Sequence, residues 1–281
     1  MLEVNMTEKT EPYGGKNPLA YDHEKAYLPE DCDINISPSK FSTYIDKKYK
    51  WYREVVLGED GFTGSTASVI GTVVHYIAEC VGKKIEVDKD AIYAYIKSYD
   101  KHEDVDTSLV TSEFEQPASA LINDYVLVNI QNFLEVEKVL VTDLDDGIYV
   151  SGKLDLLEGT KDDCCITDYK TYNSKTKPKY IPQNYKYQLL VYAFLLIANG
   201  YKPTRMRLVY VNRYIDGGIS EKTNKPLKSY PSEVTVLTEI ITDEDIEFIS
   251  GMLNHAKETL LATEKYPELT HLLWNDPRLK V

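Results

Sequence analysis

Residues 165–171 of the sequence read CITDYKT, and this stretch decides the fold together with the GKLD segment that precedes it. Side chains alternate between the two faces of a β-strand, so Asp168 and Lys170 share one face while Tyr169 points to the other. Asp155 ends the GKLD segment, near the end of its own predicted strand, and a short connection lets the two strands lie side by side. We therefore expect Asp155 and Asp168 to converge beside Lys170.

Two carboxylates and one lysine are the parts that metal-dependent phosphodiester hydrolysis requires. Carboxylate oxygens suit Mg²⁺ or Mn²⁺, and such an ion acidifies the water bound to it. The ammonium group of Lys170 would orient that water or offset the charge that develops on the phosphate. A short D-x-K pattern also occurs by chance in salt-bridged strand pairs, so these residues alone leave both interpretations open.

The segments around this stretch alternate between helical and strand periodicity. We predict helices at about 37–57, 66–84, 88–99, 115–133, 184–199 and 242–265, strands at 136–144, 147–159, 164–171, 205–214 and 232–240, and surface loops at 99–108 and 172–183. This order predicts an α/β (α+β) fold, with a mixed central β-sheet flanked by helices.

One domain should account for most of the 281 residues, a length near the upper end of what a single core supports. Residues 1–33 are polar and contain several Gly and Pro residues, which predicts a flexible arm. We expect a single domain at 34–265, with a helical part at 34–133, a sheet core at 134–240 and a last helix at 242–265, followed by a tail at 266–281.

Composition narrows the class of protein. The net charge of −13 argues against a protein that coats nucleic acid, although a nuclease needs only a local basic path. Four cysteines form no CxxC pair, so neither a zinc site nor a disulfide framework is expected. No apolar stretch reaches the ~20 residues that cross a bilayer, and the N-terminus lacks the pattern of a signal peptide. We expect a cytoplasmic protein without a membrane partner.

Four motifs occur in a fixed order: G-x-x-x-H at 71–75, G-K-L-D at 152–155, I-T-D-Y-K-T at 166–171 and Q-L-L-V-Y at 188–192. This set resembles the RecB-like branch of the PD-(D/E)XK nucleases, and ISPSKFSTYIDKKYKWY is similar to the first helix of that branch. The resemblance covers about 34–213 and implies a restriction-endonuclease-like core with an α-helical N-terminal part.

The resemblance also implies roles for individual residues. Asp155 and Asp168 match the acidic metal ligands, and Lys170 matches the catalytic lysine. His75 matches a histidine that adds a ligand from the helical side, and the backbone carbonyl of Tyr169 would be a further ligand. A histidine inside an apolar helix is otherwise most often a core residue, so this alternative stays open for His75.

Further candidates surround this set. Gln188 and Tyr192 match a Q-x-x-x-Y motif that borders the site and contacts nucleic acid or supports the lysine, and Tyr185 shares their helix face at the i, i+3, i+7 spacing. The alternative for this face is an ordinary amphipathic core helix. Lys175 and Lys177 would hold phosphates, unless the basic loop is only a solvated linker. Glu79 and Glu137 are weaker candidates for metal ligands.

The chain departs from many relatives, because its C-terminal segment YPELTHLLWNDPRLKV contains no cysteine. Thiolates hold iron–sulfur clusters, so we expect no iron–sulfur cluster. The first acidic residue of the motif is preceded by Leu154 rather than by the usual proline.

The resemblance points to DNA, either single-stranded or an end-containing duplex, and to an exonuclease in recombination, repair or replication. No Walker A pattern is present, so ATP-driven unwinding would need a helicase or recombination partner. The composition would suit a bacteriophage or mobile-element protein. Two alternatives remain: a catalytically silent fold member that binds DNA or assembles with partners, and a metal enzyme that acts on small phosphoesters.

Overall fold

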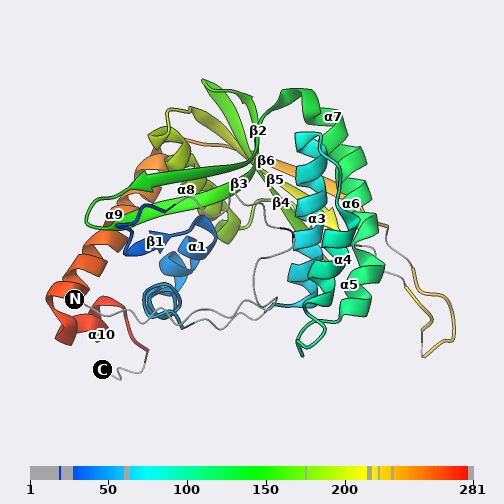
Figure 1. The fold of residues 1–281 in the computed structure, drawn as a ribbon, viewed down its shortest axis with the longest axis horizontal. Coiled ribbons are helices and arrows are strands. Elements are labelled where there is room, and N and C mark those ends of the chain that lie inside the picture. The colour runs from blue at the N-terminus through cyan, green and yellow to red at the C-terminus, as the bar shows by residue number, and fades with distance from the viewer. Residues whose placement is uncertain are drawn as a thin grey trace.

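The computed structural model describes Leu19 and residues 28–59, 64–174, 176–213, 217–220, 222–228 and 231–277. Its centre is a six-stranded sheet with helices on both faces (Figure 1). The strands are β1 (Ile34–Ile36), β2 (Phe133–Asp143), β3 (Ile148–Thr160), β4 (Asp163–Tyr172), β5 (Pro203–Asn212) and β6 (Val234–Ile240), in the order β1-β3-β4-β5-β6, with β2 also paired to β3. Pairs β1–β3 and β4–β5 are parallel and the others antiparallel. The predicted mixed sheet is therefore confirmed.

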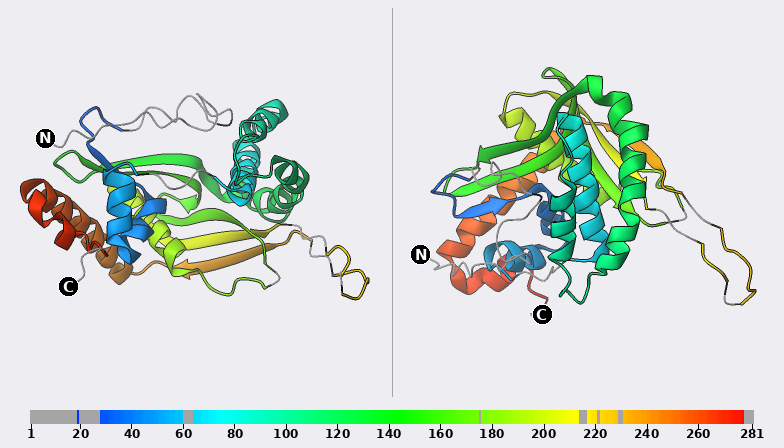
Figure 2. Two further views of the ribbon diagram at one scale, coloured as in Figure 1. Left: turned by 90° about the horizontal axis from the view of Figure 1, so that it is seen from below. Right: turned by 45° about the vertical axis from the view of Figure 1, so that its right-hand side comes forward.

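Two helical layers enclose this sheet (Figures 1 and 2). One contains α3 (Thr66–Lys83), α4 (Lys89–Lys97), α5 (Thr107–Glu113), α6 (Glu115–Leu121) and α7 (Leu127–Asn129), and the other contains α1 (Pro38–Asp46), α2 (Lys48–Trp51), α8 (Gln183–Ala198), α9 (Asp243–Lys265) and α10 (Thr270–Leu273). Alternate residues of β4 face the two layers, with Ile166 in the core beneath α8 and Tyr169 in the core beneath α3. In the described part of the chain, no helix is long and apolar enough to cross a membrane.

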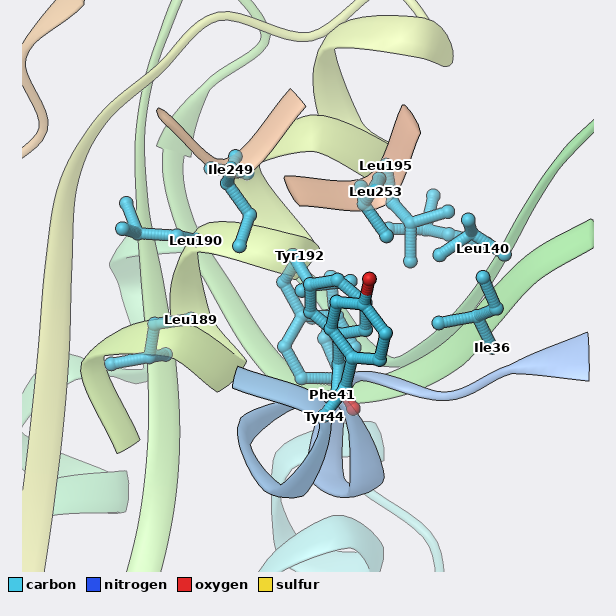
Figure 3. Packing of buried hydrophobic residues seen from close by; sticks show 14 of the residues in the cluster. Ile36, Phe41, Tyr44, Leu140, Leu189, Leu190, Tyr192, Leu195, Ile249 and Leu253 are labelled. Atoms are coloured by element: carbon cyan, nitrogen blue, oxygen red, sulfur yellow. The ribbon is translucent and has the colours of Figure 1, made fainter. Parts of the chain in front are cut away.

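The layer that contains α8 carries an aromatic core. Phe41 and Tyr44 of α1 stack with their ring centroids 5.2 Å apart, among apolar side chains of α8 and α9 (Figure 3). In the same core Trp274 is fully buried and stacks on Tyr52 at 4.6 Å. Trp274 belongs to the segment for which the sequence predicted only a tail, and its packing joins that segment to the first helices.

The predicted first helix is interrupted in the structure. It ends at Asp46, because Lys47 adopts a non-helical backbone with φ −147° and ψ 71°, and α2 and the π-helical turn Tyr52–Val56 follow. The short strand β1 precedes it and was not predicted, since three residues are too few to show a period.

Two other helix boundaries also differ from the prediction. Helix α5 begins inside the run predicted as a loop, because the carboxylate of Asp106 caps it by accepting the N–H of Leu109 at 2.9 Å. The helix predicted at 115–133 changes to a π-helical turn at Ile122–Val126, and β2 already begins at Phe133.

A gap in one edge of β3 positions the candidate site. Val150 pairs with β2 on one edge of β3 and with β1 on the other, and Leu156 pairs with β2 and with β4 in the same way. Strands β1 and β4 therefore both lie along the edge of β3 that is opposite β2. Between them, residues 151–155 have no strand neighbour on that edge among the described residues. Helices α1 and α8 fill the gap, and a Cβ on Gly152 would lie 2.7 Å from Pro38 and 2.9 Å from Tyr192. Only glycine leaves room for this packing.

Candidate active site

Asp155 and Asp168 meet where the β3–β4 ladder stops. The ladder ends with the pair Leu156 and Thr167, and the two aspartates are the next residues on the two strands. At this point the side chain of Asp155 replaces the ladder, because its Oδ2 accepts the backbone N–H of Tyr169 at 2.7 Å. The register of β3 and β4 therefore brings the two carboxylates together, and the backbone N–H of Tyr169 holds the carboxylate of Asp155 in place.

Asp168 is held by two side chains from different elements. Its Oδ2 lies 2.5 Å from Nζ of Lys170 on the same strand face, and its Oδ1 accepts Nε2 of Gln188 at 3.0 Å. The Lys170 ammonium group also lies 5.2 Å from the ring centroid of Tyr185 on α8. Strand β4 thus supplies the carboxylate and the lysine, and α8 orients both.

His75 approaches Asp155 from the opposite helical layer. Its Nδ1 lies 3.4 Å from Oδ1 of Asp155, and its ring meets the edge of Tyr169 with centroids 5.8 Å apart. Gly71 lies one turn earlier on α3, where a Cβ would meet Oγ1 of Thr171 at 3.4 Å, an ordinary contact distance. The structure therefore brings His75 next to Asp155, and its role as a metal ligand stays a prediction.

The pKa values of the two aspartates shift in opposite directions. Burial raises the pKa of Asp168 by more than the charge of Lys170 lowers it, and the charge of Asp155 adds to the rise. Burial also raises the pKa of Asp155, but His75, Lys170 and the Tyr169 N–H outweigh it, so that its pKa falls below the usual value. Asp155 is therefore readily ionised, while Asp168 retains a proton more easily.

A cleft of about 550 Å³ opens over this centre. Its lining includes His75, Glu79, Glu137, Lys153, Asp155, Lys170 and Tyr185. Asp168 is not part of the lining and is only 5% exposed, so it lies behind the groups that face the cleft.

Glu137 lies directly beside this centre. The β2–β3 register continues on both sides of Glu137 and places it opposite Asp155. Its backbone has φ +53°, a left-handed conformation that costs about 1–3 kcal/mol for a residue other than glycine. Its Oε2 lies 2.8 Å from Nζ of Lys153, yet burial and the charge of Asp155 raise the pKa of Glu137 to about 8.

Sequence reasoning gave Glu137 little weight and did not single out Lys153. Their facing positions depend on strand register and on one unusual φ value, neither of which leaves a local sequence signal. The only clue was that Lys153 lies inside the GKLD motif.

The predicted substrate-binding residues lie in different places. Gln188 and Tyr185 adjoin Asp168 and Lys170, as described above. Tyr192 is 6% exposed, and its hydroxyl donates to the backbone carbonyl of Lys153 at 2.7 Å inside the gap in β3. Lys177 is exposed and forms an ion pair with Glu233. Lys175 lies outside the described residues.

Asp155, Asp168 and His75 are the groups that would hold a divalent cation. Carboxylate oxygens suit Mg²⁺ and Mn²⁺, whereas an imidazole is more often a ligand of a transition metal than of Mg²⁺. Burial raises the pKa values of Asp168 and Glu137, and the charge of Asp155 adds to both shifts, so a cation would stabilise the ionised forms of these groups. As the side chains now stand, no group of three His, Cys, Asp or Glu residues in the described chain meets the geometry for one ion.

Residues 35–266 match the family described as the PD-(D/E)XK nuclease superfamily. The chain belongs to this superfamily. A search of curated proteins found no match. Among solved structures, a protein of Eubacterium rectale provisionally named an exonuclease is similar to this PD-(D/E)XK chain with a TM-score of 0.52 at 14% identity, covering 88% of this chain and 87% of that one. LHK-Exo in complex with dAMP is similar with a TM-score of 0.39 at 12% identity, covering 88% and 98%.

The match confirms the family predicted from the ordered motifs. The structure agrees with this match, because the motif residues of α3, β3, β4 and α8 lie around one candidate site. The E. rectale likeness concerns the fold alone, since the two sequences are only 14% identical.

Proposed function

We propose that this chain is a divalent-metal-dependent nuclease of the RecB-like branch that hydrolyses phosphodiester bonds in DNA. One observation carries the proposal: His75, Asp155 and Lys170, from a helix and two strands, face one cleft, with Asp168 directly behind them. The contact between Asp168 and Lys170 alone would also fit a structural ion pair. The open cleft and the positioned lysine are what hydrolysis of a phosphodiester needs in addition.

Each residue contributes a definite part of the reaction. Mg²⁺ or Mn²⁺, held by Asp155, Asp168, His75 and the Tyr169 carbonyl, would acidify the attacking water and offset phosphate charge. The Tyr169 N–H fixes the orientation of the Asp155 carboxylate. Lys170 stands at the cleft wall, where its ammonium group orients the water or stabilises the charge of the transition state.

The neighbouring residues support this centre. Gln188 holds the second carboxylate, Asp168, in place. Lys153 and Tyr185 line the same cleft, so we assign them to the substrate phosphates and to an unpaired base or sugar, respectively. Lys177 and Lys175 belong to the loop that follows β4 and would contact phosphates farther along the strand.

The biological setting is a separate part of the proposal. We propose exonuclease action in recombination, repair or replication in the cytoplasm, on single-stranded DNA or on an end-containing duplex, with unwinding supplied by a helicase or recombination partner. The exonuclease name of the E. rectale structure is the reason to test linear substrates first.

The test is a cleavage assay with matched substrates. The protein is incubated with end-labelled linear DNA and with circular DNA, each single- and double-stranded, with Mg²⁺, with Mn²⁺ or with a chelator. Asp168→Ala and Lys170→Ala are compared with Lys161→Ala, which changes an exposed lysine in the turn between β3 and β4. We expect metal-dependent loss of linear DNA that the two site variants lack and the control retains.

The outcomes separate the alternatives. Cleavage of linear but not circular DNA identifies an exonuclease. Binding of DNA without cleavage would indicate the catalytically silent fold member. Activity of both site variants equal to that of the wild type would show that the proposed mechanism is wrong.

A further inference from the structure

A basic hairpin projects from the sheet near the candidate site. We call the described residues 217–220 and 222–228 the basic arm. Its two sides are joined by Leu227 N–H to Gly218 carbonyl at 3.0 Å and by Ser220 N–H to Lys225 carbonyl at 2.9 Å. A Cβ on Gly217 would lie 2.4 Å from the Leu227 carbonyl oxygen, so glycine is needed where the two sides touch. The basic arm is therefore an ordered hairpin, and Figures 1 and 2 show it standing away from both helical layers.

The base of the basic arm is joined to the strand that carries the catalytic lysine. Arg213, next to the end of β5, donates its backbone N–H to the carbonyl of Tyr172 at the end of β4, at 2.8 Å. Asn212 donates its N–H to the carbonyl of Glu233 on the returning chain, at 2.9 Å. Since β4 and β5 are parallel, this is the sheet end toward which Lys170 lies. Four residues of chain keep residue 217 within ~14 Å of Arg213, whatever the direction of the arm.

The charge of the basic arm is opposite to that of the whole chain. Residues 217–228 contain three lysines and one glutamate, whereas the chain carries a net charge of −13. Lys222, Lys225 and Lys228 all lie in an exposed run. Among the described residues beside the base, Glu233 pairs with Lys177 and Glu113 pairs with Arg213.

Exposed lysines on a projecting hairpin suit an extended polyanion better than a compact ligand. No described residue of the arm lines the candidate cleft. Phosphates of a nucleic-acid backbone attract lysine through charge alone, without a shaped pocket. Two apolar side chains, Ile219 and Leu227, are also 65% and 52% exposed and could contact sugar or base edges.

We propose that the basic arm binds the phosphate backbone of the nucleic-acid substrate beyond the bond being cleaved. This rests on the proposed nuclease function. The arm would hold the strand or duplex on the side of the sheet where Lys170 and Lys177 lie. It would supply the local basic path that an acidic protein needs in order to engage DNA.

The test removes the charge of the arm and measures how binding depends on salt. The arm variant is Lys222→Ala/Lys225→Ala/Lys228→Ala. The control variant is Lys161→Ala/Lys202→Ala/Lys265→Ala, which removes three exposed lysines, two of them at the opposite end of β4 and β5. Binding to a blunt duplex and to a single strand is followed by fluorescence anisotropy in chelator, where metal-dependent cleavage is off, and cleavage is assayed separately with metal.

If all three lysines contact phosphates, the arm variant lowers the slope of log K against log salt by about 2.7 on duplex or about 2.1 on single strands. At about 0.1 M salt its affinity falls on the order of tenfold or more, and the substrate on which the slope changes identifies the strandedness that the arm contacts. The control variant keeps the wild-type slope.

The remaining outcomes decide the proposal either way. Equal slopes for wild type and arm variant overturn it, and intact cleavage in that case leaves the nuclease function standing. Equal losses in the arm and control variants overturn it as well, because they show an effect of net charge alone. A third outcome is that DNA binding depends on the arm lysines but the wild type cleaves no DNA. That result supports the proposed role of the arm and contradicts the proposed nuclease function.

Discussion

Glu158 and Asp168 are two buried carboxylates on the neighbouring strands β3 and β4. Each is 5% exposed and forms an ion pair with a basic side chain, Arg207 for Glu158 and Lys170 for Asp168. Glu158 lies in a saturated network, because its Oε2 accepts Tyr125 at 2.6 Å, Thr167 at 2.5 Å and Arg207 at 2.7 Å. Burial and ion pairing therefore do not distinguish the two positions. The difference must come from what else surrounds each carboxylate.

Asp168 has like charges around it and a cleft in front of it. Burial raises its pKa and the charge of Asp155 adds to the rise, while Glu137, whose pKa is also raised, lies on β2 beside Asp155. The sheet differs as well: Glu158 pairs with β2 on one side and with Cys165 of β4 on the other, whereas the β3 edge before Asp155 has no strand partner in the described chain. Neighbouring like charge at an edge with no strand partner among the described residues marks the candidate site, and a balanced pair with strand partners on both sides marks a structural one.

The largest effect that this comparison predicts concerns activity. Asp168→Asn should lower kcat on the order of 10³-fold, since it removes one proposed metal ligand and the partner of Lys170. Glu158→Gln should change kcat by less than about threefold, because its network does not face the catalytic cleft. Single-turnover cleavage of linear DNA measures both. Equal losses in the two variants would remove the distinction between the clusters.

Stability should respond in the opposite order. Glu158→Gln leaves the guanidinium group of Arg207 without its buried charge partner, which should lower the free energy of unfolding by about 3 kcal/mol. Asp168→Asn should cost less, because Lys170 still interacts with the charge of Asp155. Urea denaturation of both variants at one pH makes the comparison. A larger loss for Asp168→Asn would indicate that the candidate site is also the main structural ion pair.

The strand that carries Asp168 and Lys170 was predictable from local patterns. Period-2 alternation placed Asp168 and Lys170 on one face, and the short connection after the GKLD segment brought Asp155 beside them. The 3.6-residue period predicted the helix α3, which carries His75. These features depend on residues close together in the sequence, which is why the sequence alone was sufficient for them.

The rest of the site depends on long-range register. Glu137 faces Asp155 because β2 lies antiparallel along β3 with a left-handed residue in the middle. The role of Gly152 depends on packing against α1, more than 100 residues away in the chain. Neither depends on a pattern within one segment, so periodicity could not reveal them.

A smaller loss of stability is expected at the part of the β3 edge that lacks a strand partner among the described residues. Gly152→Ala would place a methyl group within 2.9 Å of Pro38 and Tyr192, and the resulting overpacking should cost about 2 kcal/mol of unfolding free energy. A matched control is Gly251→Ala on α9, whose Cβ would meet nothing within 4 Å and which should stabilise the helix slightly. Thermal unfolding of the two variants gives the difference. Equal melting temperatures would mean that the gap adapts without cost.

The smallest effect concerns Tyr192, which the sequence predicted to border the site and to contact nucleic acid or support the lysine. Its hydroxyl donates to the Lys153 carbonyl, so Tyr192→Phe should leave that carbonyl unsatisfied and lower stability by about 1 kcal/mol. The same change should lower kcat modestly and leave KM unchanged, since the side chain lies beneath the strand rather than at the cleft wall. Steady-state kinetics on linear DNA separates the roles. A rise in KM at unchanged stability would show that Tyr192 contacts the substrate and would place the open edge of β3, not only the cleft, within the binding surface.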